Sequence, residues 1–515
     1  MGDALLHTTH EGRDDVRLPR RLLAAMVLVS FFALSVSSYV ALTRSLQYQG
    51  RDEGPNAAYA IELSQGRLPT INTPVTTDAA RHPLVVAGRT RMSDESHRHI
   101  WTANHPPLYY ALSVPLVYAA DQLDAPQLLI VGMRLINAVG SGLCVLLVGL
   151  IAFELTRRPE VALLATGISA SCAVLVSAGG HIANDGVAVA ASSLALLGTL
   201  RILGRGLTGR RLALVAVAGV AAAGAKAPGV LTVALCGAAL AVALLVQDRS
   251  RRGVLRAVGA AAVATGLPAL ATGWFYVRNI VLYGDPTASG ALLEKFAREP
   301  NGTWWQVLSD AQMWADWLRR LWTPVLGEWY VVFVDLLAVV AALGLLALLA
   351  RRVVGGPRGP AGSGRGWLLL TVHALVVVVN LIGFVAGGGN PNDRYLMPLM
   401  PVLASALALG VVAILDLVPV GPQRLRARWA TAALTLGLVV YGTLLFKRFA
   451  DSPMYRGLLP DAHTTLAASV LAAGLAGAVV AVVLAVVLAA WPPAEARTTY
   501  AAPRPPRGRP APHRR

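Results

Sequence analysis

The segment LLAAMVLVSFFALSVSSYVALT, residues 22–43, contains no charged side chain and is long enough to cross a lipid bilayer as an α-helix. Similar runs recur through the chain of 515 residues, of which 55% are hydrophobic and 14% charged. Within lipid, a single segment satisfies all of its own backbone N–H and C=O groups when it is helical. The sequence therefore predicts an all-α polytopic membrane protein.

Thirteen apolar segments follow one another along the chain, which predicts a bundle of about 12–13 transmembrane helices. The segment at 107–120 is the shortest, is interrupted by Pro115 and precedes the acidic turn DQLDAP. We expect it to be partly inserted or re-entrant, which leaves twelve full crossings. The segments are 22–43, 107–120, 128–156, 161–179, 186–204, 211–225, 228–246, 254–275, 329–350, 367–386, 396–415, 428–446 and 465–491.

Arginine clusters between these segments predict the orientation. The formal net charge of +17 would suggest nucleic-acid binding in a soluble protein, but here it follows the positive-inside pattern of a plasma membrane protein. The leader 1–21 and a disordered basic tail 492–515 are then cytoplasmic, and the loops 44–107 and 284–326 are extracytoplasmic. Clusters placed inside are 157–158, 201–211, 249–252, 351–352 and 424–428.

The first extracytoplasmic loop, 44–107, carries the adjacent acids Asp52 and Glu53 in RDEGPNAAYA. A carboxylate there can accept the proton of an acceptor hydroxyl as a general base. A solvated loop acid explains the same residues equally well. The segment 55–65 behind them is expected to form an amphipathic helix on the membrane, with its apolar residues Ala58, Ile61 and Leu63 facing lipid.

Further polar residues stand at the extracytoplasmic ends of other segments. NHPPLYY (104–110) offers His105 as a metal or phosphate ligand, although a lone interfacial histidine is more often a hydrogen-bonded structural residue. MRLINA (133–138) contributes Arg134. HIANDG (181–186) contributes Asp185 at a helix start, where a simple N-cap is the alternative.

Three more segment ends carry cations. AKAPG (225–229) places Lys226 in a break between apolar halves, where an ammonium needs an anionic partner. Arg278 in WFYVRNIVLYGDP (274–286) is suited to binding a phosphate. The alternative is that it anchors the helix end among aromatic residues at the membrane interface. GGGNPNDRYLMPLMP (387–401) contributes Arg394 and Tyr395 as candidate binding residues. The alternative is that this segment is an ordinary flexible turn.

One side of the membrane thus collects candidate bases and cations, which is what transfer from a lipid phosphate requires. A transporter or flippase of a lipid-linked or anionic solute is the alternative. It predicts polar residues at the bilayer midplane, and only Lys226 fits that picture. A catalytically silent membrane subunit is the third hypothesis. The candidate bases are Asp52, Glu53 and Asp185, and the candidate cations are Arg134, Lys226, Arg278 and Arg394.

At these residues the chain resembles the GT-C superfamily of integral-membrane glycosyltransferases, in the branch of the protein O-mannosyltransferases and lipid A aminoarabinose transferases. The resemblance rests on the Asp52–Glu53 pair, HPPLYY, the RL of 134–135, the ND pair at 184–185, WFYVRN…YGDP and RYLMPLMP. It implies a catalytic module at 22–410 followed by C-terminal transmembrane helices at 411–491.

The resemblance further implies inverting transfer of a sugar from a polyprenyl-phosphate donor at the extracytoplasmic face. The first-loop carboxylate of the family, Asp52 here with Glu53 beside it, would be catalytic. The acceptor, whether glycan, lipid or protein, stays open, and the departure GPNAAY leaves open whether a divalent metal ion takes part. The residues expected to bind the substrate or lipid phosphate are His105, Arg134, Asp185, Lys226, Arg278, Arg394 and Tyr395.

Other polar and aromatic residues are given structural roles. The tryptophans of 288–324 are expected at the membrane interface rather than stacked on sugar rings. Asp335 and His373, each alone in an apolar segment, are expected to form hydrogen bonds within the bundle rather than a proton path.

Overall fold

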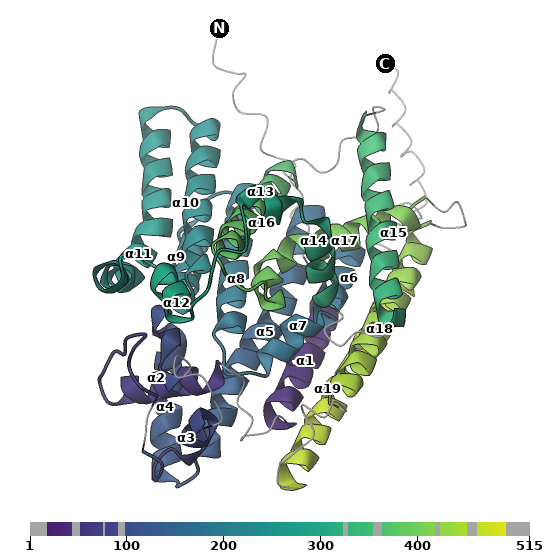
Figure 1. Ribbon diagram of the computed structural model, residues 1–515. Coiled ribbons are helices and arrows are strands. Elements are labelled where there is room, and N and C mark those ends of the chain that lie inside the picture. The colour runs from purple at the N-terminus through teal and green to yellow at the C-terminus, as the bar shows by residue number, and fades with distance from the viewer. Residues whose placement is uncertain are drawn as a thin grey trace, which may run out of the picture.

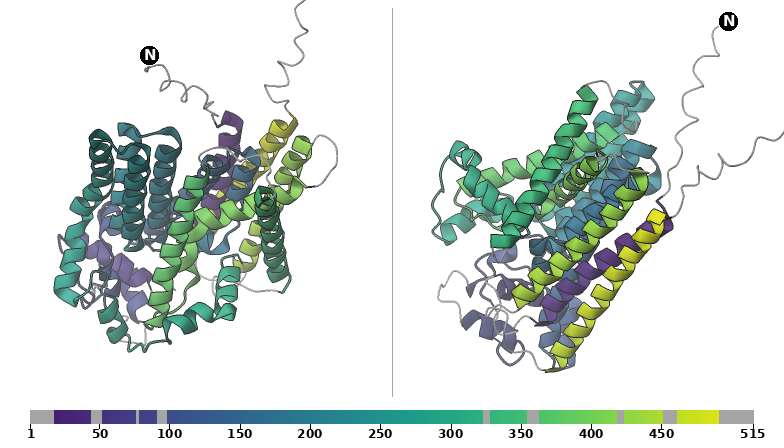
Figure 2. Two further views of the ribbon diagram at one scale, coloured as in Figure 1. Left: turned by 90° about the horizontal axis from the view of Figure 1, so that it is seen from above. Right: turned by 90° about the vertical axis from the view of Figure 1, so that its right-hand side faces the viewer.

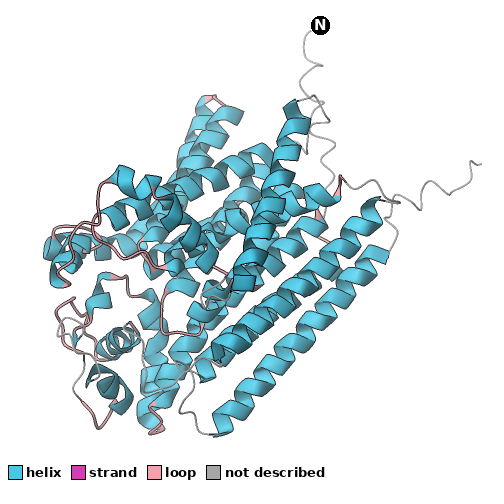
Figure 3. Cartoon of the chain, turned by 45° about the vertical axis from the view of Figure 1, so that its right-hand side comes forward, coloured by secondary structure: helices cyan, strands magenta, loops and turns pink. Residues whose placement is uncertain are grey.

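The computed structural model describes residues 18–43, 52–75, 78–90, 98–322, 328–353, 363–417, 423–450 and 461–490. Within these ranges the chain is helical and contains one isolated β-bridge, between Pro74 and His99 (Figure 3). Each of the thirteen expected apolar segments coincides with a helix or a helix pair. The prediction of an all-α polytopic membrane protein is therefore confirmed.

The helices of the bundle (Figure 1) correspond to the apolar segments, whose side chains can face either other helices or lipid. They are α1 (Arg20–Thr43), α5 (Gln127–Thr156), α6 (Pro159–Ala170), α7 (Ala173–Gly179), α8 (Asp185–Arg205), α9 (Gly209–Ala225), α10 (Pro228–Gln247), α11 (Arg251–Tyr283), α15 (Glu328–Val353), α16 (Ser363–Ala386), α17 (Met400–Leu415), α18 (Gln423–Ala450) and α19 (Asp461–Ala490).

Helices α5 and α8 form the centre and run parallel to each other. A Cβ added at Gly140 would lie 2.5 Å from the carbonyl carbon of Gly186, so two glycines allow the backbones to touch. Further along, Cys144 Sγ lies 3.9 Å from Ser193 Oγ. The bent pair α6–α7 returns the chain between them, with a bend of 58° at the break. The end of α5 therefore lies beside the end of α8, where Glu154 contacts Arg201 and Arg205, whereas the start of α8 lies beside Asn137 and Gly140, so that α5 begins about three turns earlier.

The first and last described helices pack against each other (Figure 2, right, purple and yellow). Gly474 of α19 contacts Ser35 of α1, and Gly477 contacts Phe31, where an added Cβ would lie 3.3 Å from Cδ1. Rising numbers on α19 meet falling numbers on α1, so the two helices are antiparallel. The start of α1 and the end of α19 consequently lie at the same end of the bundle.

Short helices connect the longer ones, and those of the first loop lie together at the lower left of Figure 1. Those of the first loop are α2 (Glu53–Ser64), α3 (Pro83–Thr90), the 3₁₀-helix η2 (Trp101–Asn104) and α4 (Leu108–Gln122). Those between α11 and α15 are α12 (Ser289–Lys295), α13 (Trp304–Ser309) and α14 (Ala311–Arg320), and the 3₁₀-helix η3 (Asp393–Leu399) precedes α17.

The expected amphipathic helix is present as α2, but its predicted lipid-facing orientation is wrong. Ala58 and Ile61 are each about 1% exposed and join a hydrophobic cluster with Tyr109, Tyr110 and residues of α5. Tyr59 and Tyr110 stack with ring centroids 3.9 Å apart. The apolar face of α2 is therefore covered by α4 and α5, which the sequence of α2 alone could not show.

Eight helices in the described part of the chain are long and apolar enough to cross a membrane, and the bent pair α6–α7 raises the number to nine. The apolar parts of α15 and α18, Val334–Ala350 and Ala430–Leu444, are shorter. Helix α4 has 15 residues with Pro115 inside it. The twelve full crossings and the partial insertion of 107–120 stay predictions.

Candidate functional site

Four charged side chains from four parts of the sequence meet at the end of the bundle that carries the first loop. Arg394 forms an ion pair with Asp52 and lies 3.6 Å from the second carboxylate, Asp185. Lys226 forms an ion pair with the other oxygen of Asp185. We call these residues the Asp52 cluster. Its two carboxylates and two cations alternate, and no net charge remains.

Local structure explains how each member reaches the cluster. Asp52 immediately precedes α2 and Asp185 is the first residue of α8. Lys226 follows α9 in an extended conformation, before Pro228 starts α10 at a position where proline needs no hydrogen-bond partner. The Asn392 side chain accepts a hydrogen bond from Arg394 N at the start of η3. All four residues thus lie at or beside the ends of helices.

The members of the cluster differ in accessibility. The side chains of Asp52 and Arg394 are 24% and 23% exposed, whereas those of Asp185 and Lys226 are 5% and 14% exposed. The Asp52–Arg394 pair therefore forms the open side of the cluster, and the Asp185–Lys226 pair forms its base.

Glu53, the other acid of the predicted pair, points elsewhere. Its oxygens accept hydrogen bonds from Arg134 Nε at 3.0 Å and Nη2 at 2.9 Å, and from Ile182 N at 3.0 Å. Arg134 also donates to the carbonyl of Ala41 at 3.2 Å. Glu53 is 2% exposed and Arg134 is fully buried. This pair joins α1, α2, α5 and the segment before α8.

His105 and Tyr395 lie beside the Asp52 cluster. Burial, reinforced by the charges of Lys226 and Arg394 and opposed by Asp185, lowers the pKa of His105 to about 3. His105 is therefore neutral near pH 7, and its Nδ1 is buried without a hydrogen-bond partner among the described residues. The ring of Tyr395 lies 5.7 Å from Lys226 Nζ and 5.6 Å from Arg394 Cζ, within the range of cation–π contacts.

Arg278 forms its hydrogen bonds outside the cluster. Its Nη2 donates to the carbonyls of Leu68 at 3.3 Å and Pro69 at 2.7 Å, and its Cζ lies 5.9 Å from the ring centroid of Phe275. Its Nη1 is buried without a hydrogen-bond partner among the described residues. In this structure Arg278 fixes the first loop to α11, and its predicted role in phosphate binding stays a proposal.

Two amide side chains that the sequence did not single out hold the site in place. Asn56 donates to the carbonyl of Ile182 at 2.8 Å and accepts from the Tyr110 hydroxyl at 2.8 Å. Asn137 donates to the carbonyls of Ala178 and His181 and accepts from Gly186 N at 2.8 Å. Asn137 was detectable as an uncharged polar residue within an apolar segment, where such groups need a partner.

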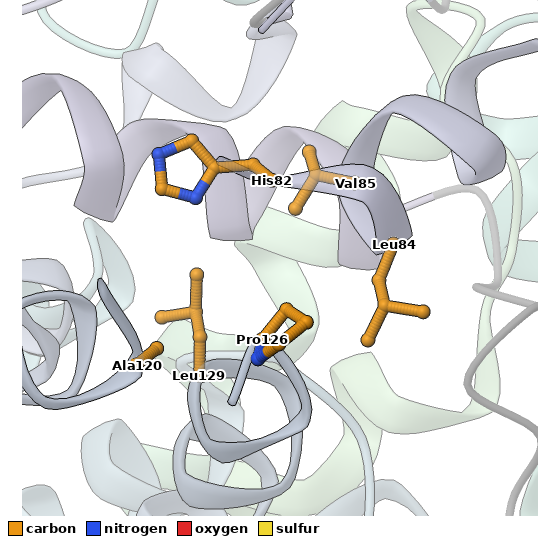
Figure 4. Close-up of a pocket in the computed structure, with 6 residues that line it drawn as sticks. All are labelled: His82, Leu84, Val85, Ala120, Pro126 and Leu129. Carbon is orange, nitrogen blue, oxygen red and sulfur yellow. The ribbon is translucent and has the colours of Figure 1, made fainter. Parts of the chain in front are cut away.

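The first-loop histidines do not gather around a common centre in the described part of the chain, which holds no group of three or more His, Cys, Asp or Glu side chains placed to bind a metal. His82 lies 3.9 Å from Asp121 and lines a small apolar pocket with Leu84 and Leu129 (Figure 4). The pocket includes no member of the Asp52 cluster. His97, Asp94 and Glu95 lie outside the described residues.

The two isolated polar residues in apolar segments are hydrogen-bonded, which confirms the prediction. Asp335 accepts from Arg319 Nε at 2.9 Å and Nη2 at 3.0 Å. His373 Nε2 lies 3.2 Å from Thr232 Oγ1. The tryptophans of the loop at 284–326 differ among themselves: Trp317 is 3% exposed and Trp305 is 76% exposed. Their predicted position at the membrane interface stays a prediction.

The candidate residues separate in space as the sequence suggested. Four of the residues predicted outside, Asp52, Asp185, Lys226 and Arg394, meet at the start of α8. At the other end of α8, three of the arginines predicted inside, Arg157, Arg201 and Arg205, contact Glu154 of α5. The side of the membrane that each end faces stays a prediction.

Residues 116–283 match the family model described as dolichyl-phosphate-mannose-protein mannosyltransferase. This segment includes Arg134, Asp185, Lys226 and Arg278 but not Asp52 or Arg394. The expected resemblance to the protein O-mannosyltransferases is confirmed over this segment.

Three solved structures are similar to the whole chain at low identity. ArnT from Cupriavidus metallidurans bound to undecaprenyl phosphate is 14% identical, with 89% of this chain and 76% of that chain covered and a TM-score of 0.46. The Archaeoglobus fulgidus oligosaccharyltransferase in the apo form is 12% identical, with 88% and 55% covered and a TM-score of 0.41. Arabinosyltransferase EmbB from Mycobacterium smegmatis is 13% identical, with 94% and 43% covered and a TM-score of 0.41.

The chain thus spans about half the length of the last two proteins. No curated protein sequence matches the chain.

Proposed function

We propose that this membrane protein is a glycosyltransferase that moves a sugar from a polyprenyl-phosphate donor to an acceptor hydroxyl at the extracytoplasmic face. The observation that carries the proposal is the Asp52 cluster, in which a partly exposed carboxylate of the first loop meets two cations beside the start of the membrane-spanning helix α8. The match of residues 116–283 to a family of mannosyltransferases supports sugar transfer as the reaction.

In the proposed reaction Asp52 takes the proton of the acceptor hydroxyl. The hydroxyl oxygen then attacks the anomeric carbon, the bond from this carbon to the phosphate oxygen breaks, and polyprenyl phosphate leaves with the bonding electrons. A single displacement of this kind inverts the anomeric centre. Lys226 and Arg394 would stabilise the negative charge on the leaving phosphate.

The exposure of the two acids supports this division of roles. Asp52 is partly exposed, and its charged partner among the described residues is Arg394, which also reaches Asp185. When a donor phosphate takes up the guanidinium of Arg394, Asp52 becomes available to an acceptor. Glu53 is buried in its pair with Arg134, so we propose that it positions α2 rather than exchanging protons.

Neutral His105 and the ring of Tyr395 border the cluster and would contact the donor, while Arg278 would act through the loop it fixes. Whether a divalent metal ion takes part is open, and the acceptor can be a glycan, a lipid or a protein.

The test uses purified full-length protein in lipid, radiolabelled polyprenyl-phosphate sugars and a membrane extract as acceptor. Asp52→Asn should lower transfer by about 10²- to 10⁴-fold, the usual contribution of a general base. The matched control is Glu62→Gln, which removes another carboxylate of α2 that is paired with an arginine, Arg67. This control should transfer at the wild-type rate.

Equal transfer by Asp52→Asn and wild type would overturn the role of Asp52 and move the base to Glu53 or Asp185. If no donor supports transfer while the labelled lipid binds or changes leaflet, the protein is a transporter and the proposal fails.

A further inference from the structure

A second charged cluster lies at the other end of α5 and α8, about 30 Å along α8 from Asp185 at the usual helical rise. The carboxylate of Glu154 lies 2.7 Å from Arg157 Nη2, 3.1 Å from Arg201 Nε and 2.6 Å from Arg205 Nη2. We call these four residues the Glu154 cluster. Glu154 is 4% exposed, whereas the arginines are 26% to 32% exposed.

The backbone is shaped to gather these arginines. Arg157 ends α5 in the left-handed region, with φ of 57°. Its guanidinium lies over Gly204 of α8, where an added Cβ would be 3.7 Å from Nη2. Arg211, at the start of α9, donates from Nη1 to the carbonyls of Arg205 at 2.8 Å and Gly206 at 2.7 Å. Four guanidinium groups from three helices therefore converge on one spot.

The charges at this spot do not cancel. The four guanidinium groups lie near one carboxylate, that of Glu154, and near the C-terminal ends of α5 and α8. Each of these two helix ends is equivalent to about half a negative charge. A positive excess of roughly two charges is left. Each guanidinium carries five N–H donors in a planar fork, and each of the three in the cluster is partly exposed. The Asp52 cluster, in contrast, balances two carboxylates with two cations.

We propose that the Glu154 cluster binds the phosphate of an anionic phospholipid headgroup. Arginine forks match the oxygens of a phosphate, and basic sites between membrane-spanning helices are suited to such headgroups. Both α5 and α8 are long and apolar enough to cross the membrane, so their ends lie at the depth of the headgroups. This position selects a lipid phosphate over a dissolved one. The proposal is independent of the glycosyltransferase activity.

The test counts lipids bound to the full-length protein by native mass spectrometry, after purification in a neutral detergent and addition of phosphatidylglycerol or phosphatidylcholine. Wild-type protein should retain phosphatidylglycerol preferentially. The double variant Arg201→Gln/Arg205→Gln should bind it about tenfold more weakly, the value of one charge-assisted hydrogen bond. The matched control is Arg249→Gln/Arg252→Gln, which removes two exposed arginines at the same end of the bundle, near the start of α11.

The double variant leaves Glu154 with fewer partners and can fold poorly. The triple variant Glu154→Gln/Arg201→Gln/Arg205→Gln removes the buried carboxylate together with these arginines, and it should show the same tenfold loss. The proposal is overturned if wild type retains both lipids equally, if the triple variant loses no more than the control, or if inorganic phosphate at equal concentration displaces the lipid.

Discussion

Asp52 and Glu53 are neighbours in sequence and each pairs with an arginine, yet the two pairs are built differently. The Glu53–Arg134 pair is at most 3% exposed, and three hydrogen bonds from two elements occupy Glu53. The Asp52–Arg394 pair is about one-quarter exposed, and its arginine is shared with Asp185. The Glu53–Arg134 pair is therefore buried with its hydrogen bonds satisfied, whereas the Asp52–Arg394 pair can exchange partners.

The difference shows how a helix start separates the roles of adjacent residues. Asp52 precedes α2 and points toward η3 and α8, whereas Glu53 is the first residue of α2 and points into the bundle toward α5. A saturated buried ion pair fixes geometry, because removing one partner leaves an unpaired buried charge. An exposed, shared pair can release its carboxylate when another anion arrives.

The largest effect that would sharpen this comparison is on folding. Arg134→Ala should lower the free energy of unfolding by about 3 to 5 kcal/mol, because Glu53 would remain buried without its partner. Thermal unfolding in a mild detergent measures the change. The double variant Glu53→Gln/Arg134→Met should recover most of the loss, and an Arg134→Ala protein as stable as wild type would contradict a structural role for this pair.

A change in the α5–α8 contact should have the next largest effect. A Cβ at Gly186 would lie 2.5 Å from the carbonyl oxygen of Asn137, so Gly186→Ala must separate the helices and shift Asp185. We expect a loss of about 1 to 3 kcal/mol in unfolding free energy, as for other overpacked cores. Gly266→Ala on α11 is the control, because nothing lies within 4 Å of its added Cβ. Equal stability of the two variants would refute the close contact.

A smaller effect is expected from weakening the open pair without removing its charge. Arg394→Lys keeps a cation but cannot reach Asp52 and Asp185 together, so transfer should fall about tenfold, the value of one charge-assisted hydrogen bond. The same substitution at Arg67, which pairs with Glu62 on α2, is the control and should leave transfer unchanged. If the Arg394→Lys and Arg67→Lys variants transfer sugar equally well, transfer does not depend on the guanidinium group of Arg394.

A different kind of effect, a dependence on pH, concerns acid stability. Because the pKa of His105 falls from 6.5 to about 3 on folding, the unfolded chain binds a proton that the folded chain does not between these values. Stability contributed by neutral His105 is present above pH 6.5 and is lost as the pH falls toward 3. His105→Asn should therefore lose less stability between pH 7 and pH 4 than wild type. His99→Asn, a variant at another histidine of the same loop, is the comparison. If it reduces the loss of stability between pH 7 and pH 4 as much as His105→Asn does, the effect is not specific to His105.

Much of this arrangement was predictable from sequence because polar residues at the ends of apolar segments are forced to a membrane surface. That reasoning placed Asp52, Asp185, Lys226 and Arg394 on one side, and the structure brings them together. It could not separate Asp52 from Glu53, since their directions depend on where α5 and η3 pack.

Similar limits explain the other differences. The apolar face of α2 could cover lipid or protein, and only the position of α4 decides that it covers protein. Arg278 is preceded by aromatic residues and followed by a turn, as an arginine near a phosphate can be, but its nearest acceptors are carbonyls of a distant loop. Contacts of this kind depend on tertiary structure that no local pattern records.

The antiparallel contact between α1 and α19 has a consequence for biogenesis. Among the described helices, α1 leaves the ribosome first and α19 last, with more than 400 residues between them, so at ordinary synthesis rates α1 waits roughly 20 to 80 s for its partner. During that interval the face of α1 that holds Ser35 and Phe31 is open to lipid or to an insertion chaperone. The described bundle is therefore completed only once α19 has been inserted, and a chain truncated before α19 would present this uncovered face of α1 to the quality-control machinery of the membrane.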